Sequence, residues 1–213
     1  APLVGAVTGD GTGAANAAND YTFQRWQAVP GPSEWVLENT PAAEADTVFI
    51  AAHNLAGRLV TIATQLNDGA GYVDRATFTP ADNSTICAMF TYGDGLPVLC
   101  RRIRVTVDDG DGVAVGIIRA GVALQMAAPF YSGHAPTTLN RVTEARQQFS
   151  EAGQWLGRQI QRRAVEGSYG WKHLPRAWYG DEFEPFAQTL PLAPFGIAGN
   201  PLRMPDDVAW CWT

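Results

Sequence analysis

Residues 98–119 read VLCRRIRVTVDDGDGVAVGIIR, and this stretch decides the expected fold. From residue 102 to residue 107, polar and apolar side chains alternate. Such alternation is typical of a strand with one face in water and the other in a core. The Asp- and Gly-rich run 108–112 predicts a turn, and a second β-type run follows it. The stretch therefore points to an antiparallel β protein.

Similar β-type runs, separated by turn residues, continue on both sides of this stretch. The expected strands are Glu34–Glu38, Thr47–Ala52, Leu59–Leu66, Tyr72–Phe78, Ser84–Tyr92, Val98–Val107 and Val113–Met126. Short strands at roughly ten-residue spacing predict an antiparallel sandwich or jelly roll. We place this β-sandwich domain at residues 21–127. Residues 1–20 are rich in Gly and Asn, so we expect a flexible or partner-ordered arm there.

The pattern changes after a Pro- and Gly-punctuated connector at residues 128–136. The expected elements beyond it are strands over 154–167 and 168–173, a helix over Pro175–Thr189, and strands over Phe195–Ala198 and Val208–Trp212. Pro175 suits the first turn of a helix, and Pro185 should kink or shorten it. We therefore expect a ββαββ module over residues 137–213, which makes the chain mainly β.

Composition excludes several classes of protein. The chain has 213 residues, 46% of them hydrophobic, and a formal net charge of −6. These values do not fit intrinsic disorder, and no apolar run is long enough to predict membrane insertion. Residues 1–127 carry 7 Arg and 13 acidic residues, whereas residues 128–213 carry 8 basic and 8 acidic residues. The excess negative charge lies in the first part, and without a basic stripe we expect no nucleic-acid binding.

No group of residues predicts catalysis, a metal or a cofactor. The three His have no metal-ligand spacing. We interpret His53 as a hydrogen-bonded structural residue and His134 as a residue of the domain junction. The acidic run 108–112 lacks the third ligand and the closing Glu of a calcium loop, so we interpret it as a solvated hairpin turn. We therefore expect a protein that is not an enzyme.

Three cysteines, Cys87, Cys100 and Cys211, lack the CxxC spacing of zinc sites. Cys87 and Cys100 lie almost symmetrically about the turn at residues 92–95. A disulfide across a hairpin is one alternative. The other, which we expect, is free buried thiols in a protein made in a reducing cytosol.

Aromatic residues supply the candidate binding surfaces. Trp26 and Trp35, together with Tyr21, flank a Pro-rich loop and could stack on a sugar ring; packing in the core is the alternative. Aromatic and Arg side chains are also frequent anchors of protein interfaces. The expected subunit-interface residues are Trp155, Arg158, Arg162, Arg163, Trp171, Trp210 and Trp212.

Several motifs resemble those of a known family. They are PFYSGHAP at 129–136, TLNR at 138–141, SEAGQWLGR at 150–158 and PDDVAWCWT at 205–213. As a set they resemble virion structural proteins of tailed bacteriophages. The resemblance implies a non-enzymatic component of the distal tail or baseplate hub, located in the virion tail and assembled in the host cytoplasm.

The same resemblance implies an architecture and partners. It implies a discoidin-like, galactose-binding-like N-terminal sandwich and a tail-tube-like C-terminal module. That module would form a ring with copies of itself and with other tail proteins. The alternative function is a carbohydrate-binding module for attachment to a host-surface glycan through Trp26 and Trp35. A third alternative, a polysaccharide-degrading enzyme, would depend on Asp109, Asp111 or His53.

Overall fold

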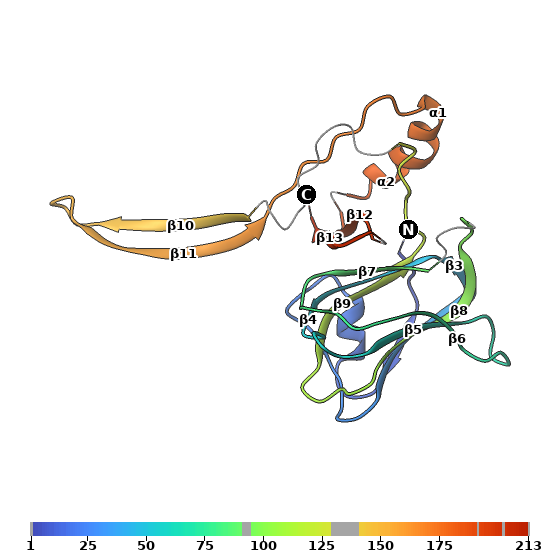
Figure 1. Cartoon of the computed structure of the whole chain (residues 1–213). Coiled ribbons are helices and arrows are strands. Elements are labelled where there is room, and N and C mark those ends of the chain that lie inside the picture. Colours follow the sequence, from blue (N-terminus) through green and yellow to red (C-terminus); the bar gives the residue numbers. More distant parts are fainter. Residues whose placement is uncertain (1, 91–94, 129–140, 191, 202, 213) are drawn as a thin grey trace. The chain divides into compact units, whose positions relative to one another are not determined.

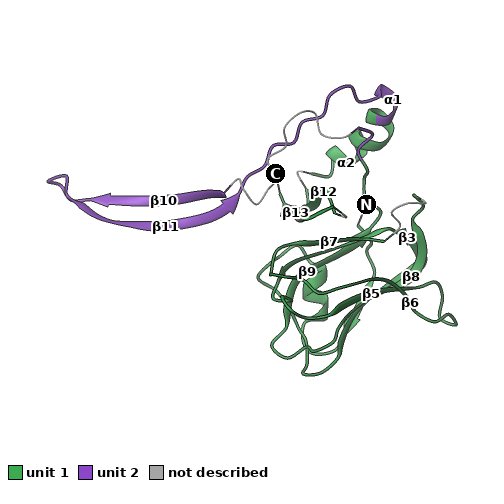
Figure 2. Cartoon of the chain, viewed as in Figure 1, with its two compact units in different colours: residues 1–125, 179–213 green, residues 126–178 purple. Residues whose placement is uncertain are grey.

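The computed structural model describes residues 2–90, 95–128, 141–190, 192–201 and 203–212 (Figure 1). They divide into two compact units (Figure 2). Unit 1 contains residues 1–125 and 179–213, and unit 2 contains residues 126–178. The turn at 91–94, nearly all of the expected connector, and His134 lie outside the described residues. The described part is mainly β, as the sequence predicts.

Unit 1 contains a sandwich of two antiparallel sheets. The first has the strand order β1-β3-β8-β5-β6, and the second has the order β2-β9-β4-β7. Their bounds are β1 Ala6–Gly9, β2 Trp26–Gln27, β3 Ser33–Ala45, β4 Thr47–His53, β5 Val60–Gln65, β6 Val73–Phe78, β7 Ile86–Met89, β8 Val98–Val107 and β9 Ala114–Gly121. The expected N-terminal antiparallel sandwich is therefore confirmed. The prediction missed β1, β2 and the second half of β3.

The alternation in β8 places one row of its side chains between the sheets. Ile103, Val105 and Val107 are buried in the core, whereas Arg102 and Arg104 lie on the outer face. Strands β8 and β9 lie in different sheets. The acidic turn at 108–112 therefore joins the two sheets, and its interpretation as a hairpin turn is wrong.

Residues 1–20 are not an arm. Strand β1 pairs with β3 from Ala6↔Glu38 to Gly9↔Trp35, and the 3-10 helix η1 (Ala14–Ala18) buries Ala17 completely. Small residues fit here because this segment packs closely against the sandwich. We expected a flexible or partner-ordered arm because this segment is rich in Gly and Asn and has few large apolar side chains. Two of those few, Leu3 and Val7, pack against the core.

The C-terminal strands also belong to unit 1. Strands β12 (Phe195–Asn200) and β13 (Met204–Cys211) form a hairpin, and β13 contacts β7. An isolated hairpin is at best marginally stable in water. This hairpin is held by packing, because Val208 is buried and Gly196 lies against the ring of Phe49. The elements observed within residues 141–212 follow one another as two strands, a helical segment and two strands, but they are divided between the two units and do not form one module.

The expected helix is present as three short segments that follow one another without a gap. These are α1 (Arg176–Trp178), the π-helical η3 (Tyr179–Phe183) and α2 (Glu184–Ala187). Pro185 lies in the first turn of α2, where its missing N–H interrupts the preceding helical bonds. None of the helices in the described part of the chain has the length and apolar character needed to cross a bilayer.

Unit 2 contains a two-stranded antiparallel ribbon. Strand β10 (Arg141–Phe149) pairs with β11 (Trp155–Val165), with irregularities at Glu144/Ala145 and Gln148/Phe149. The expected strand at 154–167 is present. The expected strand at 168–173 is absent, and β10 takes its place as the partner of β11. Strand β10 was not predicted because neither of its faces enters a core, so its sequence is polar and lacks the alternation that marks a half-buried strand.

Candidate functional site

The two tryptophans predicted to stack on a sugar lie in the core. Trp26 and Trp35 are each 0% exposed. Their indole N–H groups donate hydrogen bonds to backbone oxygens, that of Trp26 to Asp10 at 2.6 Å and that of Trp35 to Ala14 at 2.9 Å. Neither ring offers a face to a ligand. The sugar-stacking prediction for these two residues is therefore wrong, and the core-packing alternative is correct.

The third residue of that prediction, Tyr21, lies at the surface beside a second aromatic ring. Tyr21 is 57% exposed and Phe23 is 75% exposed, and their ring centroids are 5.5 Å apart with a 40° angle between the planes. We call residues 19–25 the aromatic loop. Phe23 is not among the predicted binding residues, although the alternating aromatics of Tyr21-Thr22-Phe23 within a polar run are a usable signal.

Hydrogen bonds fix the first half of the aromatic loop. The side-chain oxygen of Asn19 accepts from the backbone N–H of Tyr21 at 2.7 Å, and its amide nitrogen donates to Gln24 at 2.5 Å. Arg119 of β9 donates to the carboxylate of Asp20 at 2.6 Å and also to the carbonyl oxygen of Ala18. These contacts tie the loop to the adjacent strand.

A glycine lets the middle of the loop approach the sheet. A β-carbon at Gly116 of β9 would lie 2.8 Å from the carbonyl oxygen of Thr22 and 3.0 Å from the β-carbon of Ala52. Ala52 itself has a positive φ of 53°, which is costly for a residue with a side chain. The register of β4 and β9 skips Ala52 opposite Gly116. The loop is therefore seated on an irregular, closely packed part of the sheet.

The second half of the loop ends at the buried Trp26, so both ends are anchored. Between them, the polar side chains of Gln24 and Arg25 are exposed beside the two aromatic rings. The arrangement is a held loop that presents apolar ring surface together with amide and guanidinium donors. It suits a flat ligand that has both C–H surface and hydroxyl groups.

His53 is a structural residue, as the sequence analysis interpreted it. Its Nδ1 accepts from the backbone N–H of Leu55 at 3.2 Å, so its Nε2 carries the proton and donates to the carbonyl oxygen of Ser84 at 2.7 Å. Burial lowers the pKa of His53, against the smaller opposing effects of the Ser84 bond and the Asp82 charge. Both ring nitrogens are engaged within the fold.

Of the two acidic residues that a polysaccharide-degrading enzyme would need, Asp109 has its carboxylate engaged within a turn, and Asp111 contributes backbone groups to the same turn. Arg58 pairs with the carboxylate of Asp109, which also accepts the backbone N–H of Asp111 at 3.1 Å. The Asp111 hydrogen bond and the Arg58 side chain lower the pKa of Asp109. Within the described ranges, no three His, Cys, Asp or Glu side chains are grouped so that they could hold a metal ion.

Charged residues on the outer face of the first sheet bind one another. Glu38 accepts hydrogen bonds from Arg101 and Arg102, and both guanidinium groups also pair with Asp68. The Arg102 bond, followed by that of Arg101, lowers the pKa of Glu38. Arg104 lies 3.9 Å from the centroid of the Tyr72 ring. This network stabilises the sheet surface and engages Glu38 and Asp68 within the fold.

The cysteines are free thiols. Cys87 lies in β7 and Cys100 in β8, which belong to different sheets. They are therefore not neighbours across a hairpin, as the disulfide alternative required.

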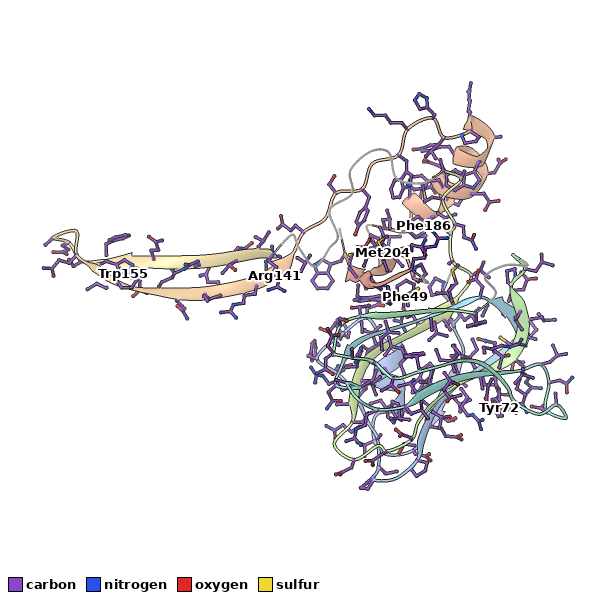
Figure 3. The ribbon with its side chains drawn as sticks, viewed as in Figure 1. Phe49, Tyr72, Arg141, Trp155, Phe186 and Met204 are labelled. Atoms are coloured by element: carbon purple, nitrogen blue, oxygen red, sulfur yellow. The ribbon has the colours of Figure 1, made fainter. Side chains whose placement is uncertain are left out.

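The predicted subunit-interface residues are divided between the two units. Trp155, Arg158, Arg162 and Arg163 lie on the β10–β11 ribbon, and Trp171 is half-buried elsewhere in unit 2. Trp210 is half-buried and Trp212 exposed, both in unit 1. Trp155 is 63% exposed on the ribbon, where Figure 3 labels it. Arg162 pairs with Glu144 at 2.9 Å and with Glu166 at 3.4 Å.

The sequence matches no known protein family, and no curated protein matches it. Solved structures similar to the chain have β-sandwich folds. One is chitosan-binding module 1 of a chitosanase/glucanase from Paenibacillus sp. IK-5, which is 16% identical in sequence. The match covers 55% of this chain and 94% of that chain, with a TM-score of 0.46. Another is a pectin-binding carbohydrate-binding module, with 23% identity, 61% and 96% coverage, and a TM-score of 0.46.

A third similar structure is the family 32 carbohydrate-binding module of C. perfringens NanJ in complex with galactose. It has 15% identity, 54% of this chain and 92% of that chain covered, and a TM-score of 0.43. These likenesses concern the fold alone. The similar structures named here are carbohydrate-binding modules and not tail proteins, so the expected structural role in a bacteriophage tail is wrong.

Proposed function

We propose that unit 1 is a non-catalytic carbohydrate-binding module and that the aromatic loop is its contact surface. The exposed Tyr21–Phe23 pair supports this proposal most directly, because two large rings face solvent on a loop that is anchored at both ends. Solvent exposure of such rings costs free energy unless a ligand covers them.

The proposed binding mode follows from the shape of a sugar ring. A pyranose presents C–H groups on its faces and hydroxyl groups around its rim. The C–H face would pack on Tyr21 and Phe23, and Gln24 and Arg25 would hydrogen-bond the hydroxyls. Because the loop is already ordered by Asn19, binding would require little additional ordering of the chain.

A binding titration with the full chain tests this proposal. Chitosan, pectin and galactose are the ligands of the three similar modules, so they are suitable first test ligands. A glycan array extends the test to other sugars. We expect saturable binding that Tyr21→Ala and Phe23→Ala each weaken by about tenfold or more, the size of effect of removing a stacked aromatic ring.

Tyr179→Ala is the matched control. Tyr179 is another exposed tyrosine of unit 1, but it lies on η3, where it contacts Phe183. This variant should bind sugar like the unmodified protein. The proposed site would be refuted if the protein bound no glycan on the array. It would also be refuted if Tyr21→Ala, Phe23→Ala and the unmodified chain bound equally well.

A further inference from the structure

The β10–β11 ribbon has no core of its own. Every side chain from Arg141 to Phe149 and from Trp155 to Val165 is exposed or half-buried. A two-stranded ribbon alone is at best marginally stable in water, because it gains too little burial to offset the ordering of its backbone. A ribbon of this length therefore needs a surface to lie against.

The register of the ribbon separates its side chains into two faces. Residues paired directly across an antiparallel ribbon project to the same side, and successive pairs alternate sides. One face holds the pairs Arg141↔Val165, Thr143↔Arg163, Ala145↔Ile160, Gln147↔Arg158 and Phe149↔Trp155. We call it the Trp155 face. The other face holds Val142↔Ala164, Glu144↔Arg162, Arg146↔Gln159 and Gln148↔Gly157.

The two faces differ in character. The Trp155 face has a row of large apolar side chains, Val165, Ile160, Phe149 and Trp155, each at least 43% exposed. Among the paired residues, the other face has only Val142 and Ala164 as apolar members, and its Arg162 is already paired with Glu144. Leu156, which is 64% exposed, lies at the irregularity between Gln148 and Phe149 and belongs to neither set of pairs. Figure 3 shows the ribbon side chains projecting on both sides between the labelled Arg141 and Trp155. The Trp155 face is the one that lacks a cover.

The net charges of the two units indicate what kind of surface could cover the Trp155 face. Unit 2 contains 7 basic and 3 acidic residues, a net charge of +4, whereas unit 1 contains 8 basic and 18 acidic residues, a net charge of −10. Arg158 and Arg163 lie among the apolar side chains of the Trp155 face, and both are exposed. The apolar face of the ribbon is thus also basic, and unit 1 of the same chain carries a large net negative charge.

We propose that the Trp155 face of one copy docks on exposed carboxylates of unit 1 in a second copy. The contact would bury the apolar row and place the guanidinium groups of Arg158 and Arg163 against carboxylates. Exposed carboxylates of unit 1 without a basic partner among the described residues include Glu44, Asp74, Asp181, Glu182 and Glu184.

Two other pairings are less favourable. Two ribbons stacked through their Trp155 faces would oppose Arg158 and Arg163 with copies of themselves, and like charges in contact are destabilising. A nucleic acid would meet the basic ribbon but would be repelled by the net −10 charge of unit 1. Docking on a second copy would bury the apolar row and also pair the two arginines with carboxylates. A two-fold dimer would contain this contact twice.

Sedimentation velocity of the full chain at 50 mM and 500 mM salt tests the proposal. We expect a concentration-dependent dimer that weakens at high salt, because part of the attraction is between exposed charges. Trp155→Ala should raise the dissociation constant by about 30-fold, as expected for a buried aromatic anchor. Circular dichroism of each variant separates loss of the contact from loss of the fold.

A pair of matched charge reversals tests which face docks. Arg158→Glu and Arg146→Glu make the same change at adjacent register positions on opposite faces of the ribbon. Arg158→Glu should weaken the dimer by about tenfold or more, and Arg146→Glu should change the dissociation constant by less than about threefold. Dimerisation should protect the amides of the ribbon and of part of unit 1 from hydrogen exchange.

Three outcomes would overturn this proposal. They are a monomer at all concentrations, equal effects of the two charge reversals, and a dimer in which the ribbon gains no protection. Tight binding of a 30-base-pair duplex by a monomeric protein would instead favour a nucleic-acid partner. None of these outcomes bears on sugar binding, because the variants lie on unit 2 and the proposed sugar contacts lie on unit 1.

Discussion

The guanidinium of Arg119 lies 2.6 Å from the carboxylate of Asp20, and this contact joins strand β9 to the aromatic loop across 99 residues of sequence. The same guanidinium donates to the carbonyl oxygen of Ala18, at the end of η1. One side chain therefore holds both the start of the loop and the element before it. The position of Tyr21 and Phe23 depends on this contact.

We expect Arg119→Met to weaken sugar binding without unfolding the protein. Released from Arg119, the loop would have to be ordered on binding, which costs up to about tenfold in affinity. Calorimetric titration measures this effect. Arg58→Met, which removes the ion pair with Asp109 but leaves the aromatic loop intact, is the control and should bind normally. Equal affinity of Arg119→Met and the unmodified chain would show that the loop is held without Arg119.

Gly196→Ala should destabilise the packing of the C-terminal hairpin. A β-carbon at Gly196 would lie 2.5 Å from ring carbons of Phe49, so the ring or the strand must move. Overpacking of this kind costs about 1–3 kcal/mol in the free energy of unfolding, which urea denaturation measures. The control is Gly71→Ala, because a β-carbon there would meet nothing within 4 Å. A negligible change for Gly196→Ala would mean that the hairpin does not pack against Phe49.

Stability should decline between pH 7 and pH 5 because of His53. Burial lowers the pKa of the folded His53 below the value of about 6.5 expected in the unfolded chain. As the pH falls through that value, the unfolded chain binds a proton that the folded chain does not, so the free energy of unfolding decreases.

The His53→Gln variant isolates this effect. Its free energy of unfolding, measured in urea across the same pH range, should vary less with pH than that of the unmodified protein. His173→Gln keeps His53 and should retain the decline. An identical pH slope in His53→Gln and in the unmodified chain would assign the decline to other groups.

The thiols should react slowly in the folded protein. Burial, together with the charge of Asp46, raises the pKa of Cys87 to about 12, and burial raises the pKa of Cys100 to about 11. The reactive thiolate is therefore scarce at pH 8. We expect slow reaction with an aromatic disulfide reagent in the native state and rapid reaction of all three cysteines in urea. Rapid native labelling, or a mass 2 Da lower from a Cys87–Cys100 disulfide, would contradict this expectation.

The strands of the sandwich were predictable because alternation is a local property. In β8 the apolar side chains of Ile103, Val105 and Val107 mark the buried face without reference to any other segment. By contrast, β10 was not predictable, because a ribbon without a core has no buried face to leave a pattern. The N-terminal strand β1 was not predicted for a related reason: it is four residues long and only its Val7 packs against the core, so it carries no alternating pattern.

The candidate site was also only partly predictable from local sequence. Sequence composition pointed to aromatic residues near position 26, but it could not separate the buried Trp26 from the exposed Tyr21 five residues earlier. That distinction is made by long-range contacts, the bond from Trp26 to Asp10 and the pair of Asp20 with Arg119.

The sequence by itself determined a mainly β chain, an antiparallel sandwich and the positions of most of its strands, since each strand carries its own period of two. Only the tertiary structure decided which aromatic rings face water, that residues 179–213 belong to unit 1, and that the chain divides into an acidic and a basic unit. These features depend on which distant segments pack together, and packing between distant segments leaves no local pattern in the sequence.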